Sequence, residues 1–300
     1  MTEGSRRARS FAVEGHTIAA PPLESALYVV ATPIGNLRDV TLRALATLAA
    51  ADIVACEDTR VTSVLTRHYG IETPLIAYHD HNAAKQRPRL LAALDAGQSV
   101  ALVSDAGTPL ISDPGYRLVV EAREAGHRVV PIPGASATLA ALVAAGLPTD
   151  SFFFAGFLPP KAGPRQKRLA ELVTIPATLV FYETSPRLAE AIADMATALG
   201  GARQAAIARE LTKAFETVRG GTLTDLAAAL TKEPPPKGEI VVLVGPPVEA
   251  ATTAEEADRV LTALLAENSV SAAATEAAAI TGLPRRDLYR RALDLKDGKG

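Results

Sequence analysis

The fold of this chain is decided by the stretch Leu27-Tyr-Val-Val-Ala-Thr-Pro-Ile-Gly-Asn-Leu-Arg-Asp39. It opens with a short apolar run, residues 27–31, and then turns through a loop that contains Gly35. Similar apolar runs follow at residues 53–56, 100–103 and 129–132, and helical patterns separate them at residues 39–50, 85–96 and 114–125. Such runs, divided by crossover helices, are typical of strands buried on both faces of a mainly parallel sheet. The N-terminal half therefore predicts an open α/β sheet.

A second α/β unit is predicted after an alanine-rich helix that runs from Gly134 to about Ala145. Gly146 and Pro148 stop this helix, because glycine ends helices readily and proline cannot continue them. Strands are expected at residues 152–154, 179–182, 205–208 and 240–244. Helices are expected at residues 165–173, 186–199 and 223–232. The alternation again indicates a layered α/β domain.

The C-terminal tail contains helical patterns only. Thr252 and Glu255 form a capping box that is expected to open a helix ending near residue 267, and Ser271 is expected to cap a second helix. Thr281-Gly-Leu-Pro284 then makes a tight turn into a third helix, so the tail resembles a helix-turn-helix, with a plain helical bundle as the alternative. The expected domains are a mobile tail over residues 1–24, α/β domains over 25–136 and 137–248, and a helical extension over 249–300.

Length and composition restrict the class of protein. The chain has 300 residues, of which 48% are hydrophobic and 21% charged, so it can bury a large core. Typical domains have roughly 100 to 200 residues, which suggests two of them. The longest nearly apolar stretch, residues 137–147, is shorter than the roughly 20 residues of a membrane helix. No apolar segment follows the arginines near the N-terminus, so no secretory signal is expected and the protein is predicted to be cytoplasmic.

The cysteine count and the charge balance further restrict the kinds of site that the chain can form. The single cysteine, Cys56, excludes an intrachain disulfide and a zinc site built from several cysteines. Lysine and arginine number 31 against 33 aspartates and glutamates, so a nucleic-acid partner would need a local basic patch. His79 and His81 would face the same way on an extended segment, but no third ligand of suitable spacing stands nearby. No metal is therefore predicted.

Polar loops that contain glycine follow the predicted strands, at residues 31–39, 57–60, 104–115 and 131–136. In open α/β sheets, ligands bind beyond the carboxyl ends of the strands. Asp113 is expected to cap a helix that begins at Pro114, and Gly107 would let the backbone approach a ligand closely. No G-x-G-x-x-G follows the first strand and no G-x-x-x-x-G-K-[ST] occurs, which argues against nicotinamide cofactors and P-loop nucleotides. Each loop taken singly is also compatible with plain turn chemistry.

Further motifs accompany these loops in a fixed order. They are Glu57-Asp-Thr-Arg60, Tyr78-His-Asp-His-Asn82, Leu102-Val-Ser-Asp-Ala-Gly-Thr-Pro-Leu-Ile-Ser-Asp-Pro-Gly115, Pro131-Ile-Pro-Gly-Ala-Ser136, Phe154-Ala-Gly-Phe-Leu-Pro159, Phe181-Tyr-Glu-Thr-Ser-Pro-Arg187, Ala208-Arg-Glu-Leu-Thr-Lys213 and Lys237-Gly-Glu-Ile-Val241. Over residues 27–244 the series resembles the tetrapyrrole-methylase superfamily of S-adenosylmethionine-dependent methyltransferases, and most closely its ribosomal RNA branch. The helical tail looks like the helix-turn-helix extension of that branch.

The resemblance implies two α/β domains with S-adenosylmethionine in the trough between them, usually in a homodimer. It also implies 2'-O-methylation of a cytidine in the decoding region of 16S rRNA, with 16S rRNA or the small ribosomal subunit as partner. Tetrapyrrole enzymes of the superfamily carry a more glycine-rich first loop and a Gly-Asp-Pro motif. Here the corresponding strings are Thr32-Pro-Ile-Gly35 and Ser104-Asp-Ala, which favours RNA over a tetrapyrrole as substrate.

Site residues are expected at the ends of the strands. The predicted cofactor contacts are Pro33, Asp105, Gly107, Thr108, Ser136 and Ala137, joined, by resemblance, by Phe157, Tyr182 and Leu211. A ribose hydroxyl needs a base, or a cation that stabilises the forming alkoxide. Glu210 and Lys213, with Glu183 as a further candidate, are predicted on the acceptor side, and a structural ion pair is the alternative for the first two.

Basic runs are the candidates for contacts with RNA phosphates. They comprise Arg60, Lys161, Arg165, Lys167 and Arg168, with Arg285 and Arg286 in the last helix. A solvated helix face is the alternative for each run. Among the clustered phenylalanines, Phe152 and Phe154 are expected in the core and Phe157 in the cleft.

Two other functions stay open. A tetrapyrrole methyltransferase would keep the fold and the cofactor, but it would have a closed, arginine-lined acceptor pocket. A non-catalytic regulator that binds nucleic acid would use the terminal helices and would bind no cofactor.

Overall fold

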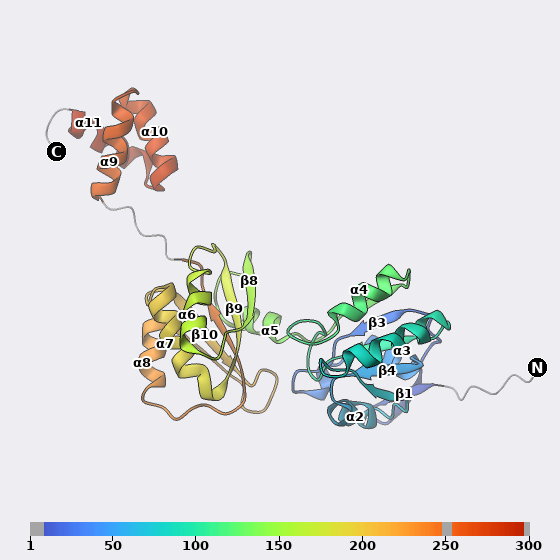
Figure 1. Cartoon of the computed structure of the whole chain (residues 1–300). Helices are drawn as coiled ribbons and strands as arrows, with labels where there is room; N and C mark the ends of the chain where they lie inside the picture. The colour runs from blue at the N-terminus through green and yellow to red at the C-terminus, as the bar shows by residue number, and fades with distance from the viewer. Residues whose placement is uncertain (1–8, 248–253, 297–300) are drawn as a thin grey trace, which may run out of the picture. The chain divides into compact units, whose positions relative to one another are not determined.

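The computed structural model describes residues 9–247 and 254–296. The chain divides into two compact units, residues 1–247 and residues 248–300. The first unit contains two five-stranded sheets and a two-stranded hairpin, and the described part of the second is helical (Figure 1). The predicted α/β fold with a helical extension is confirmed, while the division of the α/β part at residue 136 stays a prediction.

The first sheet has the strand order β5-β4-β6-β3-β7, and all neighbouring strands are parallel. Its strands are β3 (Leu27–Val30), β4 (Ile53–Cys56), β5 (Leu75–Ala77), β6 (Val100–Val103) and β7 (Val129–Ile132). The connecting helices are η1 (Leu37–Asp39), α1 (Leu42–Ala50), α2 (Thr59–His68), α3 (Ala83–Asp95) and α4 (Tyr116–Glu124). Neighbouring residues such as Val54 and Ala55 belong to different apolar clusters, so both faces are buried, as predicted. Three-residue β5 and the largely polar α2 were too weakly patterned to be predicted.

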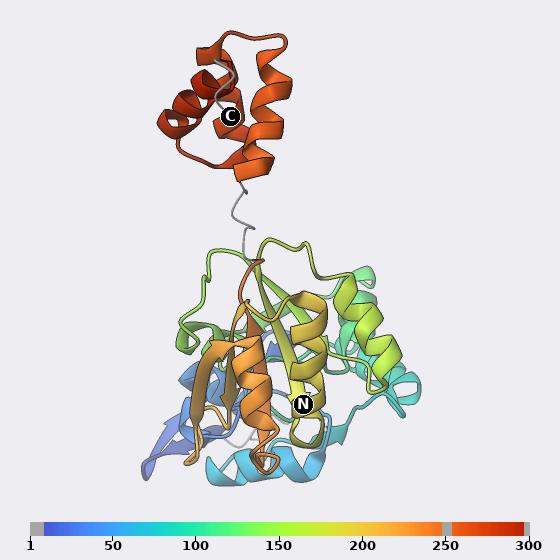
Figure 2. The ribbon, with the colours of Figure 1, turned by 90° about the vertical axis from the view of Figure 1, so that its left-hand side faces the viewer.

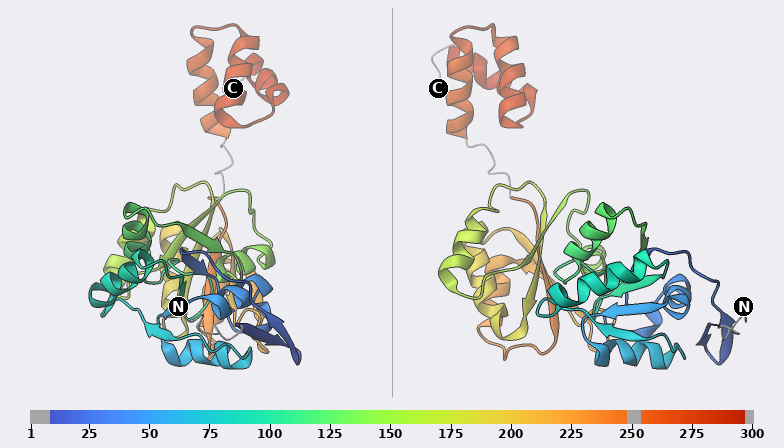
Figure 3. Two further views of the ribbon diagram at one scale, coloured as in Figure 1. Left: turned by 90° about the vertical axis from the view of Figure 1, so that its right-hand side faces the viewer. Right: turned by 45° about the vertical axis from the view of Figure 1, so that its right-hand side comes forward.

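The N-terminal segment forms a hairpin of β1 (Ser10–Val13) and β2 (His16–Ala19), shown in dark blue in Figure 3. Its two-residue turn is Glu14-Gly15, and both residues have positive φ, as a tight hairpin turn requires. Phe11 is only 3% exposed and packs into the core of the first sheet. The prediction of a mobile tail over residues 1–24 is therefore wrong for the hairpin, whose burial of Phe11 was not visible in the local pattern.

The second sheet has the order β11-β10-β12-β9-β8 and mixes parallel and antiparallel pairs. Its strands are β8 (Phe152–Phe157), β9 (Thr178–Thr184), β10 (Gln204–Arg209), β11 (Thr217–Thr222) and β12 (Glu239–Val244). Its helices are α5 (Ala137–Ala144), α6 (Ala162–Ala170), η2 (Ser185–Arg187), α7 (Leu188–Leu199) and α8 (Leu223–Leu230). Helix α7 packs between α6 and α8 over one face, where Phe181 points, while Val180 on the other face packs with α5 (Figure 2). The four predicted strands are confirmed, and β11 is an additional edge strand.

The second unit packs α9 (Ala254–Leu265), α10 (Val270–Thr281) and α11 (Arg285–Lys296) around a small apolar core. Ser269 caps α10 by accepting a hydrogen bond from the Ala272 backbone N–H, so the predicted cap Ser271 is wrong by two residues. Gly282, at φ 70°, ends α10 in the left-handed conformation that favours glycine. The predicted capping box begins at Thr252, which lies outside the described residues.

Phe11→Ala is expected to lower the free energy of unfolding by about 3 kcal/mol, because truncation of a buried phenylalanine leaves a cavity. Urea denaturation followed by circular dichroism measures this change. Thr17→Ala, at an exposed position of the partner strand, should change the stability by less than about 0.5 kcal/mol. Wild-type stability of Phe11→Ala would contradict the role of the hairpin in the core.

Candidate active site

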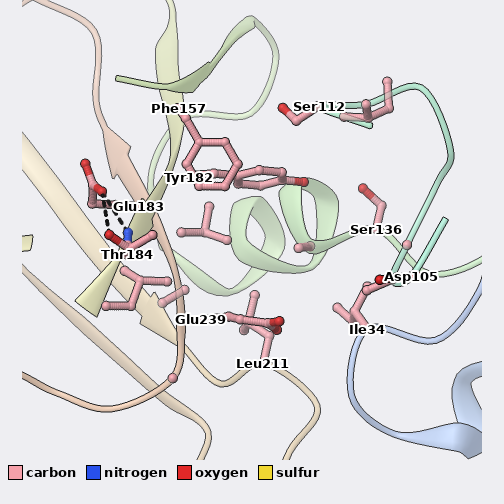
Figure 4. A pocket seen from close by; sticks show the side chains of 18 of the residues that line it. Ile34, Asp105, Ser112, Ser136, Phe157, Tyr182, Glu183, Thr184, Leu211 and Glu239 are labelled. Carbon is pink, nitrogen blue, oxygen red and sulfur yellow. Dashed lines mark hydrogen bonds between the residues drawn. The ribbon is translucent and has the colours of Figure 1, made fainter. Parts of the chain in front are cut away.

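A cavity of about 490 Å³ lies between the loops that follow the first sheet's strands and the second sheet. The first side is lined by Ile34, residues 105–108 and 111–113, and residues 136–137. The second side is lined by Phe157, residues 182–186, Ala208, Leu211 and residues 238–241. Figure 4 shows side chains of both sides converging on this space. The cavity thus lies where the carboxyl ends of the parallel strands predict a ligand site.

Hydrogen bonds join the loops of the first side into one wall. Thr32 and Gly107 exchange backbone hydrogen bonds of 2.9 and 3.1 Å, which tie the loop after β3 to the loop after β6. The Thr108 hydroxyl donates to the Ala135 carbonyl at 3.3 Å and so reaches the loop after β7. Gly107 has φ 78°, a conformation that disfavours any residue with a side chain. Hydrogen bonds among the three loops therefore hold this wall in place.

The loop after β6 differs from its prediction at its end. Helix α4 begins at Tyr116 with Gly115 before it, so the expected cap at Asp113 and start at Pro114 are wrong. Gly115 has φ 130°, and a Cβ there would come within 2.8 Å of Leu102. Asp113 instead lines the cavity. The extra residues of the loop extend the first wall.

Carboxyl groups of this wall have raised pKa values. Burial raises the pKa of Asp113, and the charge of Asp105 raises it further. Burial likewise raises the pKa of Asp105 and of Glu57, with nearby carboxylates adding to both effects. By contrast, hydrogen bonds from Arg60 lower the pKa of Asp58 to about 2. A cationic ligand in the cavity would stabilise the charged forms of the buried carboxyls.

The second side of the cavity carries an aromatic group. Phe157 and Tyr182 meet edge to face with ring centroids 5.5 Å apart, and Phe157 is 53% exposed (Figure 4). The Tyr182 hydroxyl lies 3.0 Å from the Thr138 hydroxyl on α5, which fixes the ring. Phe157 thus faces the cleft as predicted, and Phe154 packs partly buried against Tyr182. Phe152 is 45% exposed on edge strand β8, so its prediction as core is wrong.

Glu183 does not present its carboxylate to the cavity. Successive strand residues point to opposite faces, and Glu183 follows Tyr182 on β9, so its side chain lies on the side of α6 to α8. Its carboxylate is buried there and accepts from the Thr184 backbone N–H at 2.7 Å and from Arg187 at 3.3 Å. The Glu183 carboxylate is thus held by bonds within the protein, and its place on the acceptor side stays a prediction.

Lys213 lies at the seam between the two sheets. Its ammonium donates to Glu210 and to Glu239, each at 2.9 Å. Its aliphatic stem packs on Gly35, where a Cβ would come within 2.5 Å of the lysine carbons. The predicted pair Glu210–Lys213 is thus an ion pair beside the cavity, and its third partner Glu239 lines the cavity itself. Glu239 was not predicted, because only the tertiary fold brings β12 to Lys213.

The predicted cofactor residues converge on the cavity. Its lining includes Asp105, Gly107, Thr108, Ser136, Ala137, Phe157, Tyr182 and Leu211, whereas Pro33 is absent from the lining and its neighbour Ile34 takes the place. Ser136 also caps α5 by accepting from the Leu139 backbone N–H. Binding of a cofactor by these residues stays a prediction.

The structure places the residues predicted to contact RNA in different environments. Arg165 is 2% exposed and pairs with Asp194 at 2.6 Å and with Glu190 at 3.3 Å. It therefore holds α6 to α7 and is not available for contact with RNA. Its burial depends on partners in α7 that the basic run does not reveal. Lys161 and Lys167 are exposed on or beside α6, whereas Arg168 is half-buried and pairs with Glu171 at 2.9 Å. Of the other candidates, Arg60 pairs with Asp58, Arg285 bonds Ser271 and Thr275, and Arg286 is exposed.

Within residues 9–247 and 254–296, no three histidine, cysteine or acidic side chains gather where they could hold a metal ion. Within the same ranges, no helix has the length and apolar character needed to span a bilayer.

A family model described as Tetrapyrrole (Corrin/Porphyrin) Methylases matches residues 26–227. The chain belongs to this family. A second model, described as the RsmI C-terminal HTH domain, matches residues 251–296. Among tetrapyrrole methylases, the chain is 62% identical over 283 residues to ribosomal RNA small subunit methyltransferase I of Mesorhizobium japonicum, covering 94% of this chain and 96% of that protein. The Pseudomonas aeruginosa protein of that name is 50% identical over 277 residues, covering 91% and 98%.

Solved structures share the tetrapyrrole-methylase fold of the first unit. Uroporphyrin-III-C-methyltransferase from Thermus thermophilus has a TM-score of 0.53 at 24% identity and covers 73% of this chain and 93% of its own. Diphthine synthase has a TM-score of 0.57 at 17% identity, covering 73% and 89%. Identity this low supports the fold alone.

Asp113→Asn is expected to stabilise the protein above neutral pH. The raised pKa of Asp113 means that the folded state keeps its proton to higher pH than the unfolded state, so this group lowers stability as pH rises from about 4 through the folded pKa. The variant should melt at a higher temperature than the wild type at pH 8 and at an equal temperature below about pH 4. Calorimetry at both pH values measures the difference.

Asp58→Asn provides a control of opposite sign. The lowered pKa of Asp58 contributes stability above about pH 4 that is lost as the pH falls through about 2. This variant should therefore be the less stable protein at pH 8. A change of melting temperature of the same sign at pH 8 in both variants would contradict the opposite pKa shifts assigned to Asp113 and Asp58.

Proposed function

We propose that this chain is an S-adenosylmethionine-dependent methyltransferase that modifies a ribose 2'-hydroxyl of 16S rRNA in the decoding region of the small ribosomal subunit. The observation that carries the proposal is the 62% identity, over nearly the full length of both chains, to a protein named ribosomal RNA small subunit methyltransferase I. The two-walled cavity supports it, because it offers a donor site at the strand ends. Cytoplasmic location and a homodimer accompany the proposal as expectations.

The cavity fits S-adenosylmethionine in size and chemistry. Its volume of about 490 Å³ lies in the roughly 300 to 1,000 Å³ of small-molecule sites. Asp105 offers a negative charge to the cationic end, and the start of α5 at Ser136 offers backbone N–H groups to a carboxylate. Phe157 and Tyr182 supply an aromatic surface for the adenine. A related uroporphyrin-III C-methyltransferase of Thermus thermophilus was solved with S-adenyl homocysteine.

When bound, the cofactor would supply a sulfonium methyl group. The ribose 2'-oxygen would attack the methyl carbon as the carbon–sulfur bond breaks and the neutral thioether leaves, and the hydroxyl proton would pass to a carboxylate beside Lys213. Orientation and the exclusion of water should provide much of the rate. Ile34 and Leu211 contribute apolar lining that keeps water out. On the acceptor side we place Lys213, whose ammonium would stabilise a forming alkoxide, while Glu210 and Glu239 fix its position.

A tetrapyrrole acceptor is less well supported. That alternative needs an arginine-lined pocket, and the cavity lining in the described part of the chain contains neither arginine nor lysine. Exposed Lys161 and Lys167, with half-buried Arg168 beside them, offer cations outside the cavity, which suits a long polyanion better than a small acceptor.

The purified protein should transfer a labelled methyl group from S-adenosylmethionine to small ribosomal subunits from cells that lack it. Subunits from wild-type cells should accept no label, because their site is already modified. Mass mapping of 16S rRNA then locates the ribose methylation that is absent without the protein. An unaltered set of ribose methylations would falsify the assignment.

Replacement of Lys161, Lys167 and Arg168 with alanine is expected to weaken RNA binding and to reduce the slope of log K against log salt by up to about three. Filter binding at several salt concentrations measures both effects. Lys85→Ala with Arg89→Ala, on exposed positions of α3, is the matched control and should leave the slope unchanged. An unaltered slope in the α6 variant would remove these residues from the RNA surface.

A further inference from the structure

The seven-residue loop 210–216 joins β10 to β11 and runs outward from the cavity. Leu211 lines the cavity, Lys213 lies at the seam, and Phe215 is 74% exposed to solvent. Phe215 is the most exposed of the seven phenylalanines, all of which lie in the described part of the chain. One short loop therefore connects the proposed donor site to an aromatic ring on the surface.

Hydrogen bonds hold this loop in a fixed shape. The Lys213 backbone N–H donates to the Glu210 carbonyl at 3.0 Å, and the Glu216 N–H donates to the Lys213 carbonyl at 3.2 Å. The Glu216 carboxylate accepts from the Thr212 backbone N–H. Glu210 and Thr212 both have positive φ, at 52° and 65°, which costs free energy and persists only where surrounding contacts impose it. Phe215 is thus presented on a constrained loop.

A single guanidinium ties Phe215 to the cavity rim. Arg209 donates from Nη2 to the Phe215 carbonyl at 3.1 Å and from Nη1 to the Lys237 carbonyl at 3.0 Å. Lys237 directly precedes Gly238 and Glu239, which line the cavity. The Lys237 side chain is exposed and makes no ion pair within residues 9–247 and 254–296. The backbones of an exposed ring and of a cation without an ion pair are therefore bonded to the same guanidinium beside the cavity.

The other charged side chains near Phe215 and Lys237 already have partners, which leaves the Lys237 ammonium available to an anion. Glu210 and Glu239 are paired with Lys213, and Glu216 is engaged by the Thr212 backbone. Arg209 donates to three acceptors, on Phe215, on Thr217 at the start of β11, and on Lys237. Lys237 is thus the member of the group whose charge is left for an anion.

We propose that Phe215 and Lys237 form the binding site for the RNA strand next to the methylated nucleotide. The Phe215 ring stacks on an unpaired base and the Lys237 ammonium contacts a phosphate. Single-stranded RNA fits because its unstacked bases can pack on aromatic side chains, whereas bases inside a duplex are shielded. This inference rests on the proposed function, since it names the part of the rRNA acceptor that the site recognises.

The test compares Phe215→Ala with the wild type in methylation of small subunits from cells that lack the protein. The KM for subunits should rise roughly tenfold, as expected for the loss of one stacked base, while kcat stays within about twofold. The Kd of S-adenosylmethionine should not change. Phe215→Tyr should restore the KM, and Tyr116→Ala, at a position 71% exposed on α4, should behave as the wild type.

Lys237→Gln should reduce the salt slope of subunit binding by about one, whereas Lys232→Gln, at an exposed position after α8, should not. A wild-type KM for Phe215→Ala overturns the inference while leaving the proposed function intact. A changed oligomeric state at an unchanged KM also overturns it and assigns the surface to a second copy of the chain. If the wild type methylates no rRNA, both the inference and the proposed function fail.

Discussion

Ile34 makes the apolar contact on which the site depends. It lies in the loop after β3, is almost fully buried, and belongs to one apolar cluster with Ala206 and Ala208 of the second sheet and Leu211 of the loop after β10. The same residue lines the cavity. The loop must therefore join two sheets and leave a ligand-sized space beside the joint. Gly35 satisfies this constraint, because only a residue without Cβ leaves room for the stem of Lys213.

The cavity is formed at a cost to stability. Asp105 and Asp113 are partly withdrawn from water, and this burial raises their pKa values. Leu110 and Ser112, in the same loop, have positive φ of 74° and 65°. Buried charge and backbone strain of this kind concentrate at sites whose function needs them. Their coincidence on one loop supports a binding role over ordinary turn chemistry.

Local pattern was enough to predict most strands of the two sheets and the edge of the first sheet where the cavity lies, but not β5, β11 or the N-terminal hairpin. Apolar runs such as residues 100–103 carry their own signal, and parallel strands bring their carboxyl ends to one edge. Contacts between residues far apart in sequence could not be predicted from local pattern. Arg165 belongs to a basic run, yet Asp194 and Glu190 on α7 bury it. Glu239 becomes a cavity residue only because β12 pairs with β9 and β10.

The loop 210–216 links the cavity wall to the molecular surface at Phe215. Leu211, Lys213 and Phe215 alternate along it, and the positive φ values of Glu210 and Thr212 fix their relative directions. A shift of the loop that displaced Phe215 would also move Leu211 in the cavity wall and Lys213 at the seam. Because hydrogen bonds already hold the loop in one shape, Leu211, Lys213 and Phe215 keep fixed positions relative to one another. The cavity wall and the exposed ring therefore belong to one constrained element.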